Sequence, residues 1–147
     1  MSILSFLFVD AHSKGIQIGG YNLMSSSRHV GGGGDCLGPD GKPDGASCLA
    51  SQWSDNYFDK IKYFIEKTGF DMIETDGPYE GAKCSSTNHS YHMGYNDSVW
   101  TQYERNMEFY EWYKARGMYI HAPDPFYMRG INVRCNMSPP CPVAPLQ

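Results

Sequence analysis

Two carboxylates, Glu74 and Asp76, stand at the end of the short apolar segment Gly69-Phe-Asp-Met-Ile-Glu-Thr-Asp76. In a β-strand alternate side chains share one face, so Glu74 and Asp76 would project side by side. Retaining glycoside hydrolysis uses two carboxyl groups about 5–5.5 Å apart, and residues i and i+2 of a strand are close to that spacing. One strand rarely supplies both groups, however, because they approach the sugar from opposite sides. Asp76-Gly-Pro78 is equally typical of a turn, and the residue types alone leave both interpretations open.

Three segments share one pattern, in which a basic residue and then a glycine separate a helix from a short apolar strand. The glycines are Gly15, Gly69 and Gly117. A basic residue in the last helical turn complements the helix dipole, and the glycine can adopt the positive φ that ends a helix. The pattern predicts parallel, adjacent strands in the order 16–23, 71–76 and 118–123. Their carboxyl ends would share one edge, which would carry Tyr21, Asp76 and Asp124.

The segments between these strands have helical periodicity. Ser54 can cap a helix with one apolar stripe, formed by Tyr57, Phe58, Ile61, Phe64 and Ile65. Asp97 or Ser98 can cap a second helix. One side of that helix would carry Trp100, Tyr103, Met107 and Tyr110, and the other largely Glu104, Arg105, Glu108 and Glu111.

Strands that alternate with helices predict an α/β fold with a parallel sheet, either doubly wound or part of a (β/α)8 barrel. The strand-to-helix connections, residues 25–52 and 77–96, are long, and long loops at the carboxyl ends of strands are typical of barrel enzymes. A whole barrel needs about 250 residues, whereas this chain has 147. We therefore expect about three strands of a partial barrel. Residues 1–132 would be a fragment of the catalytic domain, and residues 133–147 an irregular tail containing proline and cysteine.

The five cysteines show neither a CxxC motif nor a zinc-type Cys/His spacing. Cys36 and Cys48 flank a loop rich in Gly, Pro and Asp, which suits a disulfide. Asn-X-Ser/Thr triplets begin at Asn88, Asn96 and Asn136, and together with the cysteines they favour an extracellular or lysosomal protein. His89 and His92 fall in a loop and His121 near a strand end, without a His-x-x-x-His helix, so we predict no metal site and no cofactor.

The composition excludes some classes of partner. The net charge is −4 and there is no Lys/Arg run, which argues against a nucleic-acid surface. No stretch approaches the roughly 20 apolar residues that span a bilayer. We expect neither nucleic acid nor membrane as a partner.

Ala11-His-Ser-Lys-Gly-Ile-Gln-Ile-Gly-Gly-Tyr21 and Gly69-Phe-Asp-Met-Ile-Glu-Thr-Asp76 resemble the third and fourth strands of melibiase-type α-galactosidases. The stretch from Glu74 to Cys84 further resembles less-studied hydrolases of the same barrel superfamily. The likeness covers roughly residues 5–131, and that family's Cys-bearing loop has a counterpart at Cys36 and Cys48. It implies that Asp76 is the nucleophile and that Tyr21 lies in the sugar pocket.

The chain departs from this family at one important position. Typical α-galactosidases have a lysine two residues before the nucleophile, where this chain has Glu74, which cannot donate as an ammonium does. Galactose specificity is therefore open, and the family's general acid, on a sixth strand, has no counterpart here. Tyr79 and Glu80, in the loop after Asp76, and Asp124 are further candidates for contact with substrate.

The leading hypothesis is a retaining, α-galactosidase-like glycoside hydrolase that acts on a carbohydrate. This chain would be an incomplete copy that is inactive by itself, with the rest of the catalytic domain missing. The alternatives are a non-catalytic carbohydrate-binding homologue and a metal-dependent hydrolase that uses the histidines.

Overall fold

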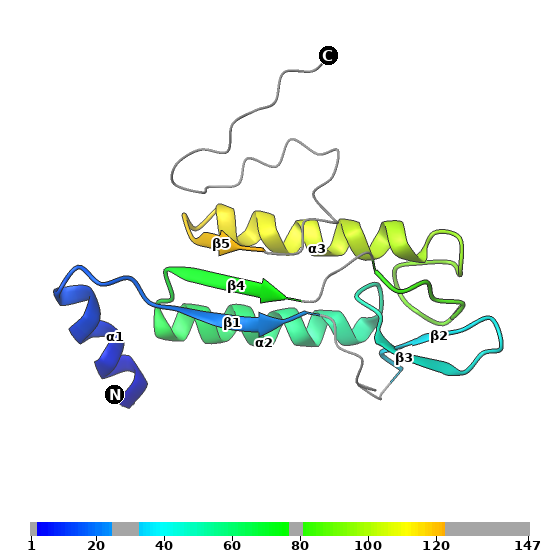
Figure 1. Ribbon diagram of the computed structural model, residues 1–147, viewed down its shortest axis with the longest axis horizontal. Helices are drawn as coiled ribbons and strands as arrows, with labels where there is room; N and C mark the ends of the chain where they lie inside the picture. Colours follow the sequence, from blue (N-terminus) through cyan, green and yellow to red (C-terminus); the bar gives the residue numbers. More distant parts are fainter. Residues whose placement is uncertain (1–2, 25–32, 77–80, 123–147) are drawn as a thin grey trace, which may run out of the picture.

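The computed structural model describes residues 3–24, 33–76 and 81–122, with side chains from residue 6 onward. The helices are α1 (Ile3–Ser13), α2 (Gln52–Thr68) and α3 (Ser98–Lys114). The strands are β1 (Gly19–Leu23), β2 (Asp35–Leu37), β3 (Pro43–Ser47), β4 (Met72–Asp76) and β5 (Tyr119–His121). Figure 1 shows α2 and α3 running along the strands β1, β4 and β5, with β2 and β3 beyond the arrowheads of β1 and β4.

The main sheet is parallel, in the strand order β1-β4-β5. This confirms the order and direction predicted for the three glycine-punctuated strands. Tyr21, Glu74 and His121 occupy one row across the sheet, because Tyr21 pairs with Glu74 and Glu74 pairs with His121. Leu23 is the register partner of Asp76, so Tyr21 and Asp76 lie on neighbouring strands one diagonal step apart.

The predicted helix stops are present at all three glycines. Gly69, for example, has φ 76°, and its N–H donates to the carbonyl of Ile65 at 2.8 Å. Gly15 and Gly117 also have positive φ. Each helix therefore ends within a few residues of the strand that follows, which fixes the direction in which that strand enters the sheet.

Both long helices cover the same face of β4. Ile73 and Thr75 are buried in that face, whereas Met72, Glu74 and Asp76 alternate with them and stay half-buried. The core between helices and sheet contains Met24, Leu49, Phe58, Ile65, Ile73, Phe109, Tyr110, Tyr113 and Met118. The alternation predicted for Glu74 and Asp76 is therefore correct, and both project from the face that α2 and α3 do not cover.

Helix α2 begins earlier than the sequence predicted. Ser51, not Ser54, is the N-cap residue, and the buried Ser54 hydroxyl donates to the Ser51 carbonyl at 2.9 Å. Ser51 is held in turn by a hydrogen bond to the Cys48 carbonyl, at 2.7 Å. A tight turn that follows β3 thus sets the start of the helix. The apolar stripe is largely as predicted, with Phe58 and Ile65 buried, although Phe64 is exposed.

The buried face of α3 overlaps the predicted apolar side only in part. Tyr110 of that side is buried, but Trp100 is 62% exposed, and the other buried positions include Gln102, Asn106, Phe109 and Tyr113. The first half of the helix packs against loop backbone rather than against apolar side chains. Gln102 accepts from the Leu49 N–H at 3.3 Å and donates to the Ala82 carbonyl at 2.7 Å. An amide satisfies both loops, which an apolar residue could not do, and this is why hydrophobic periodicity failed here.

A hairpin, which the sequence analysis did not predict, stands in the first long loop. Strands β2 and β3 pair antiparallel, with an irregular register between Asp35 and Leu37. The Ser85 N–H donates to the Leu37 carbonyl at 2.8 Å, so the loop that follows β4 is tied to the hairpin. Within the described segments, no helix is both long enough and apolar enough to cross a membrane.

Candidate active site at the carboxyl edge of the sheet

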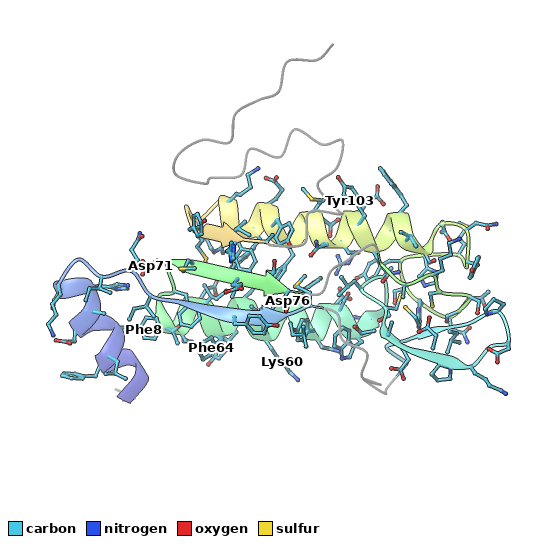
Figure 2. All side chains as sticks on the ribbon, in the orientation of Figure 1. Phe8, Lys60, Phe64, Asp71, Asp76 and Tyr103 are labelled. Atoms are coloured by element: carbon cyan, nitrogen blue, oxygen red, sulfur yellow. The ribbon has the colours of Figure 1, made fainter. Side chains whose placement is uncertain are left out.

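Asp76 is the last residue of β4 and lies at the carboxyl edge of the parallel sheet (Figure 2). The Tyr21 hydroxyl, from the adjacent strand β1, donates a hydrogen bond to Asp76 Oδ2. The backbones of the two strands are also hydrogen-bonded at this edge, because the Met24 N–H donates to the Asp76 carbonyl at 2.7 Å. The structure thus brings together two of the residues that the sequence analysis selected, and it orients the Asp76 carboxylate with a neutral donor.

Glu74 has a different partner. Its Oε1 lies 3.6 Å from His121 Nδ1, and both side chains are partly exposed on the face that the helices leave open. Glu74 therefore lies between Tyr21 and His121 in the row that crosses the sheet. A carboxylate beside an imidazole at this position can accept hydrogen bonds from ligand hydroxyl groups.

Two tyrosine hydroxyls from the helices contact the ends of β1 and β4 on the face of the sheet that the helices cover. The buried Thr75 hydroxyl lies 2.8 Å from the Tyr110 hydroxyl of α3. The Tyr57 hydroxyl of α2 lies 2.6 Å from the Leu23 carbonyl and within reach of the Asn22 side chain. Burial raises the pKa of Tyr57 to about 12, so this phenol stays protonated and remains a donor. The ends of β1 and β4 are thereby fixed relative to the helices, and Tyr21 and Asp76 are fixed with them.

Asp71, near the start of β4, has different surroundings from Asp76. Its carboxylate accepts from the Ile18 N–H at 2.8 Å and lies 2.8 Å from His12 Nε2, and it thereby ties α1 and the start of β1 to β4. Asp71 and Asp76 lie at opposite ends of the strand (Figure 2). Asp71 thus has a structural set of partners, whereas Asp76 faces the edge where parallel α/β folds bind ligands.

The remaining substrate candidates, Tyr79, Glu80 and Asp124, lie outside the described residues. Of the selected set, the structure therefore places Tyr21, Glu74 and Asp76. In chemical terms these offer one carboxylate oriented by a phenol and a second carboxylate on the same face, a set that suits nucleophilic attack and hydroxyl binding.

The sequence matches no protein-family profile and no curated protein sequence. Three solved structures of the α-N-acetylgalactosaminidase NagBb from Bifidobacterium bifidum resemble the chain. The ligand-free enzyme aligns with a TM-score of 0.61 at 19% identity, over 81% of this chain and 21% of the enzyme. Its Gal-NHAc-DNJ complex gives a TM-score of 0.59 at 18% identity, over 80% of this chain and 20% of the enzyme. A quadruple mutant gives 0.60 at 18% identity, over 81% and 21%.

The fold of the chain resembles that of part of this α-N-acetylgalactosaminidase. The chain spans about a fifth of the length of the solved enzyme that it matches. At such low identity the likeness concerns the arrangement of strands and helices, which agrees with the parallel sheet and its long carboxyl-side loops. The likeness does not single out the melibiase-type enzymes that the sequence resembles.

The cysteines do not form the predicted disulfide. Cys36, Cys48 and Cys84 are all buried free thiols. A hydrogen bond from the Cys36 thiol lowers the pKa of Cys48 to about 5, and the same contact, with burial, raises the pKa of Cys36 well above its usual range. The two residues are adjacent, as expected for the hairpin. The prediction missed that Cys84 and two imidazoles also converge on Cys48.

His89 and His92 complete this second cluster. One donor atom from each of Cys48, Cys84, His89 and His92 lies within 4.8 Å of every other, so the four could hold a metal ion. His121 is not one of them, because it lies beside Glu74. From the sequence, no metal was expected at these histidines. The compact segment Cys84-x4-His89-x2-His92 was the available signal, but its fourth member lies 36 positions before Cys84 and only the fold brings it close.

Proposed function

We propose that this segment supplies the third to fifth strands of a partial (β/α)8 barrel in a retaining α-glycosidase. The observation that carries the proposal is the Tyr21–Asp76 hydrogen bond at the carboxyl edge of a parallel sheet. Barrel enzymes place their catalytic groups at this edge. The resemblance of the fold to an α-N-acetylgalactosaminidase supports the same assignment.

In this mechanism the Asp76 carboxylate attacks the anomeric carbon of an α-glycoside. The bond from that carbon to the leaving oxygen breaks, and the leaving oxygen takes a proton from a carboxylic acid supplied by another part of the catalytic domain. A glycosyl ester of Asp76 results. The carboxyl group that protonated the leaving oxygen, now a carboxylate, then deprotonates a water molecule. This water attacks the anomeric carbon and releases the Asp76 carboxylate and the free sugar.

Tyr21 has a positioning role in this scheme. Its hydroxyl donates to Asp76 Oδ2, which leaves Oδ1 as the attacking oxygen. A neutral donor orients the carboxylate without placing the positive charge of a lysine or arginine beside it. Glu74 would accept hydrogen bonds from sugar hydroxyls rather than donate them, and His121 would steady it.

The substrate class that follows from the structural neighbour is a terminal α-linked galactose-type sugar, including N-acetylgalactosamine. An acceptor at Glu74 favours a sugar that presents hydroxyl or amide N–H donors on that side. A panel of aryl α-glycosides that differ only at the 2-position (hydroxyl against acetamido) would distinguish the two members of the class.

A carbohydrate-binding role without catalysis is the second candidate. It is favoured by the position of the two carboxylates. Within the described residues, Glu74 and Asp76 lie on the same strand, and Glu74 is paired with His121. A retaining enzyme needs its carboxyls on opposite sides of the sugar. This chain alone would then bind a sugar without hydrolysing it. A metal-dependent hydrolase is disfavoured because His121 is not part of the Cys/His cluster.

Covalent trapping tests the leading proposal. A 5-fluoro α-glycosyl fluoride forms the glycosyl-enzyme, and its ring fluorine slows the hydrolysis that follows. With the enzyme that contains this segment, we expect mass spectrometry to find one glycosyl group on the peptide that includes Asp76. Labelling of Glu74 or of another carboxylate would refute the assignment. Sugar binding without any adduct would instead support the non-catalytic candidate.

A further inference from the structure

The cluster of Cys48, Cys84, His89 and His92 has the dimensions of a tetrahedral zinc site. Cys48 Sγ lies 3.5 Å from His92 Nε2, and Cys84 Sγ lies 3.5 Å from His89 Nδ1. The two imidazole nitrogens, His89 Nδ1 and His92 Nε2, are 3.0 Å apart. Zinc–ligand bonds of about 2.3 Å to sulfur and 2.0–2.1 Å to nitrogen, at tetrahedral angles, give edges of about 3.6 Å for S···N and about 3.3 Å for N···N. These three distances are within about 0.3 Å of the ideal edges, and the remaining pairs of donor atoms lie within 4.8 Å of each other.

Partners behind the four donors fix their orientation. His92 Nδ1 lies 3.2 Å from the Gly94 carbonyl, so Nδ1 carries the proton and Nε2 turns its lone pair toward the other donors. The Leu37 N–H donates to Cys84 Sγ at 3.3 Å. Backbone partners of this kind are typical around metal-binding histidines and thiolates, because they set the tautomer and stabilise the charge on sulfur.

Burial and charge agree with a bound dication. Cys48, Cys84 and His92 are buried, and His89 is half-buried. Two thiolates and two neutral imidazoles around Zn²⁺ form a neutral unit, which can be buried at low cost, whereas a lone buried thiolate cannot. Thiolate and imidazole ligands select zinc or another soft first-row ion over Ca²⁺ or Mg²⁺, which prefer oxygen.

We propose that Cys48, Cys84, His89 and His92 bind one Zn²⁺ in a closed, structural site. Cys48 follows β3, and the other three lie in the loop between β4 and α3, so the ion joins the two long loops at the carboxyl edge of the sheet (Figure 1). Four protein ligands leave no position for water, so the site holds these loops in place and takes no part in bond cleavage. Cys36 stays outside the ligand set, where its thiol contacts Cys48 and lies 3.6 Å from the Ala82 carbonyl.

The experiment uses the full 147-residue chain, with Cys135 and Cys141 replaced by serine so that only the three buried cysteines remain. The protein is purified under reducing conditions without chelator, and zinc is measured by elemental mass spectrometry. We expect one equivalent of zinc per chain. After exchange into Co²⁺, we expect the visible bands of tetrahedral cobalt and a thiolate-to-cobalt charge-transfer band in the near ultraviolet. The cobalt spectrum needs no ligand variant and remains informative even if such variants fold poorly.

Variants distinguish the proposed zinc ligands from Cys36, the buried thiol beside them. Cys84→Ser and His92→Gln should weaken Zn²⁺ binding by on the order of 100-fold or more, since each removes one of four ligands. Cys36→Ala should keep one equivalent and the same cobalt spectrum, and it serves as the matched buried-thiol control. Two outcomes would overturn the proposal. One is a chain with less than a quarter equivalent of zinc and no tetrahedral cobalt bands. The other is a Cys36–Cys48 or Cys48–Cys84 disulfide in protein isolated without reductant, found by peptide mass spectrometry.

Discussion

The hydroxyl of Tyr21 reaches diagonally across two parallel strands to the carboxylate of Asp76. Tyr21 is paired in register with Glu74, so its ring extends toward the carboxyl end of β4 to make this contact. The two residues are 55 positions apart in the chain. Their contact exists because β1 and β4 are neighbours and in this register, and a shift of one residue would turn one of the two side chains to the covered face.

Replacement of Tyr21 by phenylalanine tests whether this contact serves catalysis. In the enzyme that contains this segment, Tyr21→Phe should lower kcat/KM by about 10- to 150-fold, the equivalent of roughly 1.5–3 kcal/mol for a hydrogen bond to a charged group. Stability should change little, because the side chain is 59% exposed. Tyr63→Phe, on the exposed side of α2, is the control and should leave kcat/KM unaltered. Equal effects of the two changes would rule out the positioning role.

Replacement of Asp76 by asparagine distinguishes a nucleophile from a turn residue. Asparagine keeps the size and most hydrogen bonding of the side chain but removes the negative charge that makes the carboxylate a nucleophile. We expect kcat to fall by on the order of 10³-fold or more, at least about 4 kcal/mol of transition-state stabilisation, with a nearly unchanged melting temperature. Asp59→Asn, at an exposed position of α2, is the matched control. A lower melting temperature combined with near-normal kcat would identify Asp76 as a turn residue instead.

The strands and the Asp76 edge could be predicted because their signals are local. A glycine after a basic helical turn, such as Gly69, specifies the end of a helix and the entry of the next strand by itself. Side-chain alternation then places Glu74 and Asp76 on one face. The diagonal reach of Tyr21 to Asp76 could not be predicted in detail, because it depends on the strand register, although both residues had been selected for the same edge.

The Cys/His cluster and the buried polar residues of α3 could not be predicted, because their determinants are distant in the sequence. Cys48 meets Cys84 only after the β2–β3 hairpin has folded back against the loop that follows β4. Gln102 is buried because two loops offer it a donor and an acceptor. Periodicity assigns such a residue to solvent, since it counts apolar side chains and cannot count backbone groups that need a partner.

Arg105, which the sequence placed on the charged side of α3, provides a test of stability. Its guanidinium pairs with Asp55 of α2, and the two side chains are only 18% and 22% exposed. It also lies over the Tyr91 ring at 4.1 Å, and the Tyr91 hydroxyl donates to Asp55 at 2.6 Å. Removal of the cation would leave Asp55 partly buried without its counter-charge and would open the contact with Tyr91.

Arg105→Ala should therefore lower the free energy of unfolding by about 2–4 kcal/mol, a little less than the cost of breaking a fully buried pair. Lys114→Ala is the control: its pair with Glu111 is more exposed and should contribute less than about 1 kcal/mol. Urea denaturation of the full chain measures both values. A difference below about 0.5 kcal/mol between the two variants would mean that the Asp55–Arg105 pair is no stronger than a surface pair.

The close approach of β1 to β4 leads to the last prediction. A Cβ added at Gly19 would lie 1.9 Å from Met72 Cγ and 2.6 Å from the Met72 carbonyl oxygen. The Met72 side chain could move, but the carbonyl belongs to the strand that pairs with Gly19 and can yield only if the two strands separate. Gly19→Ala should thus destabilise the chain by about 1–3 kcal/mol through overpacking, and it should also disturb the Tyr21–Asp76 contact two residues further along.

Gly94→Ala is the control, because a Cβ there meets nothing within 4 Å and should alter stability by less than about 0.5 kcal/mol. Urea unfolding followed by circular dichroism gives both values. If Gly19→Ala were as stable as Gly94→Ala, the packing of β1 against β4 would have to be looser than the structure describes, and the hydrogen bond that orients Asp76 would lose its support.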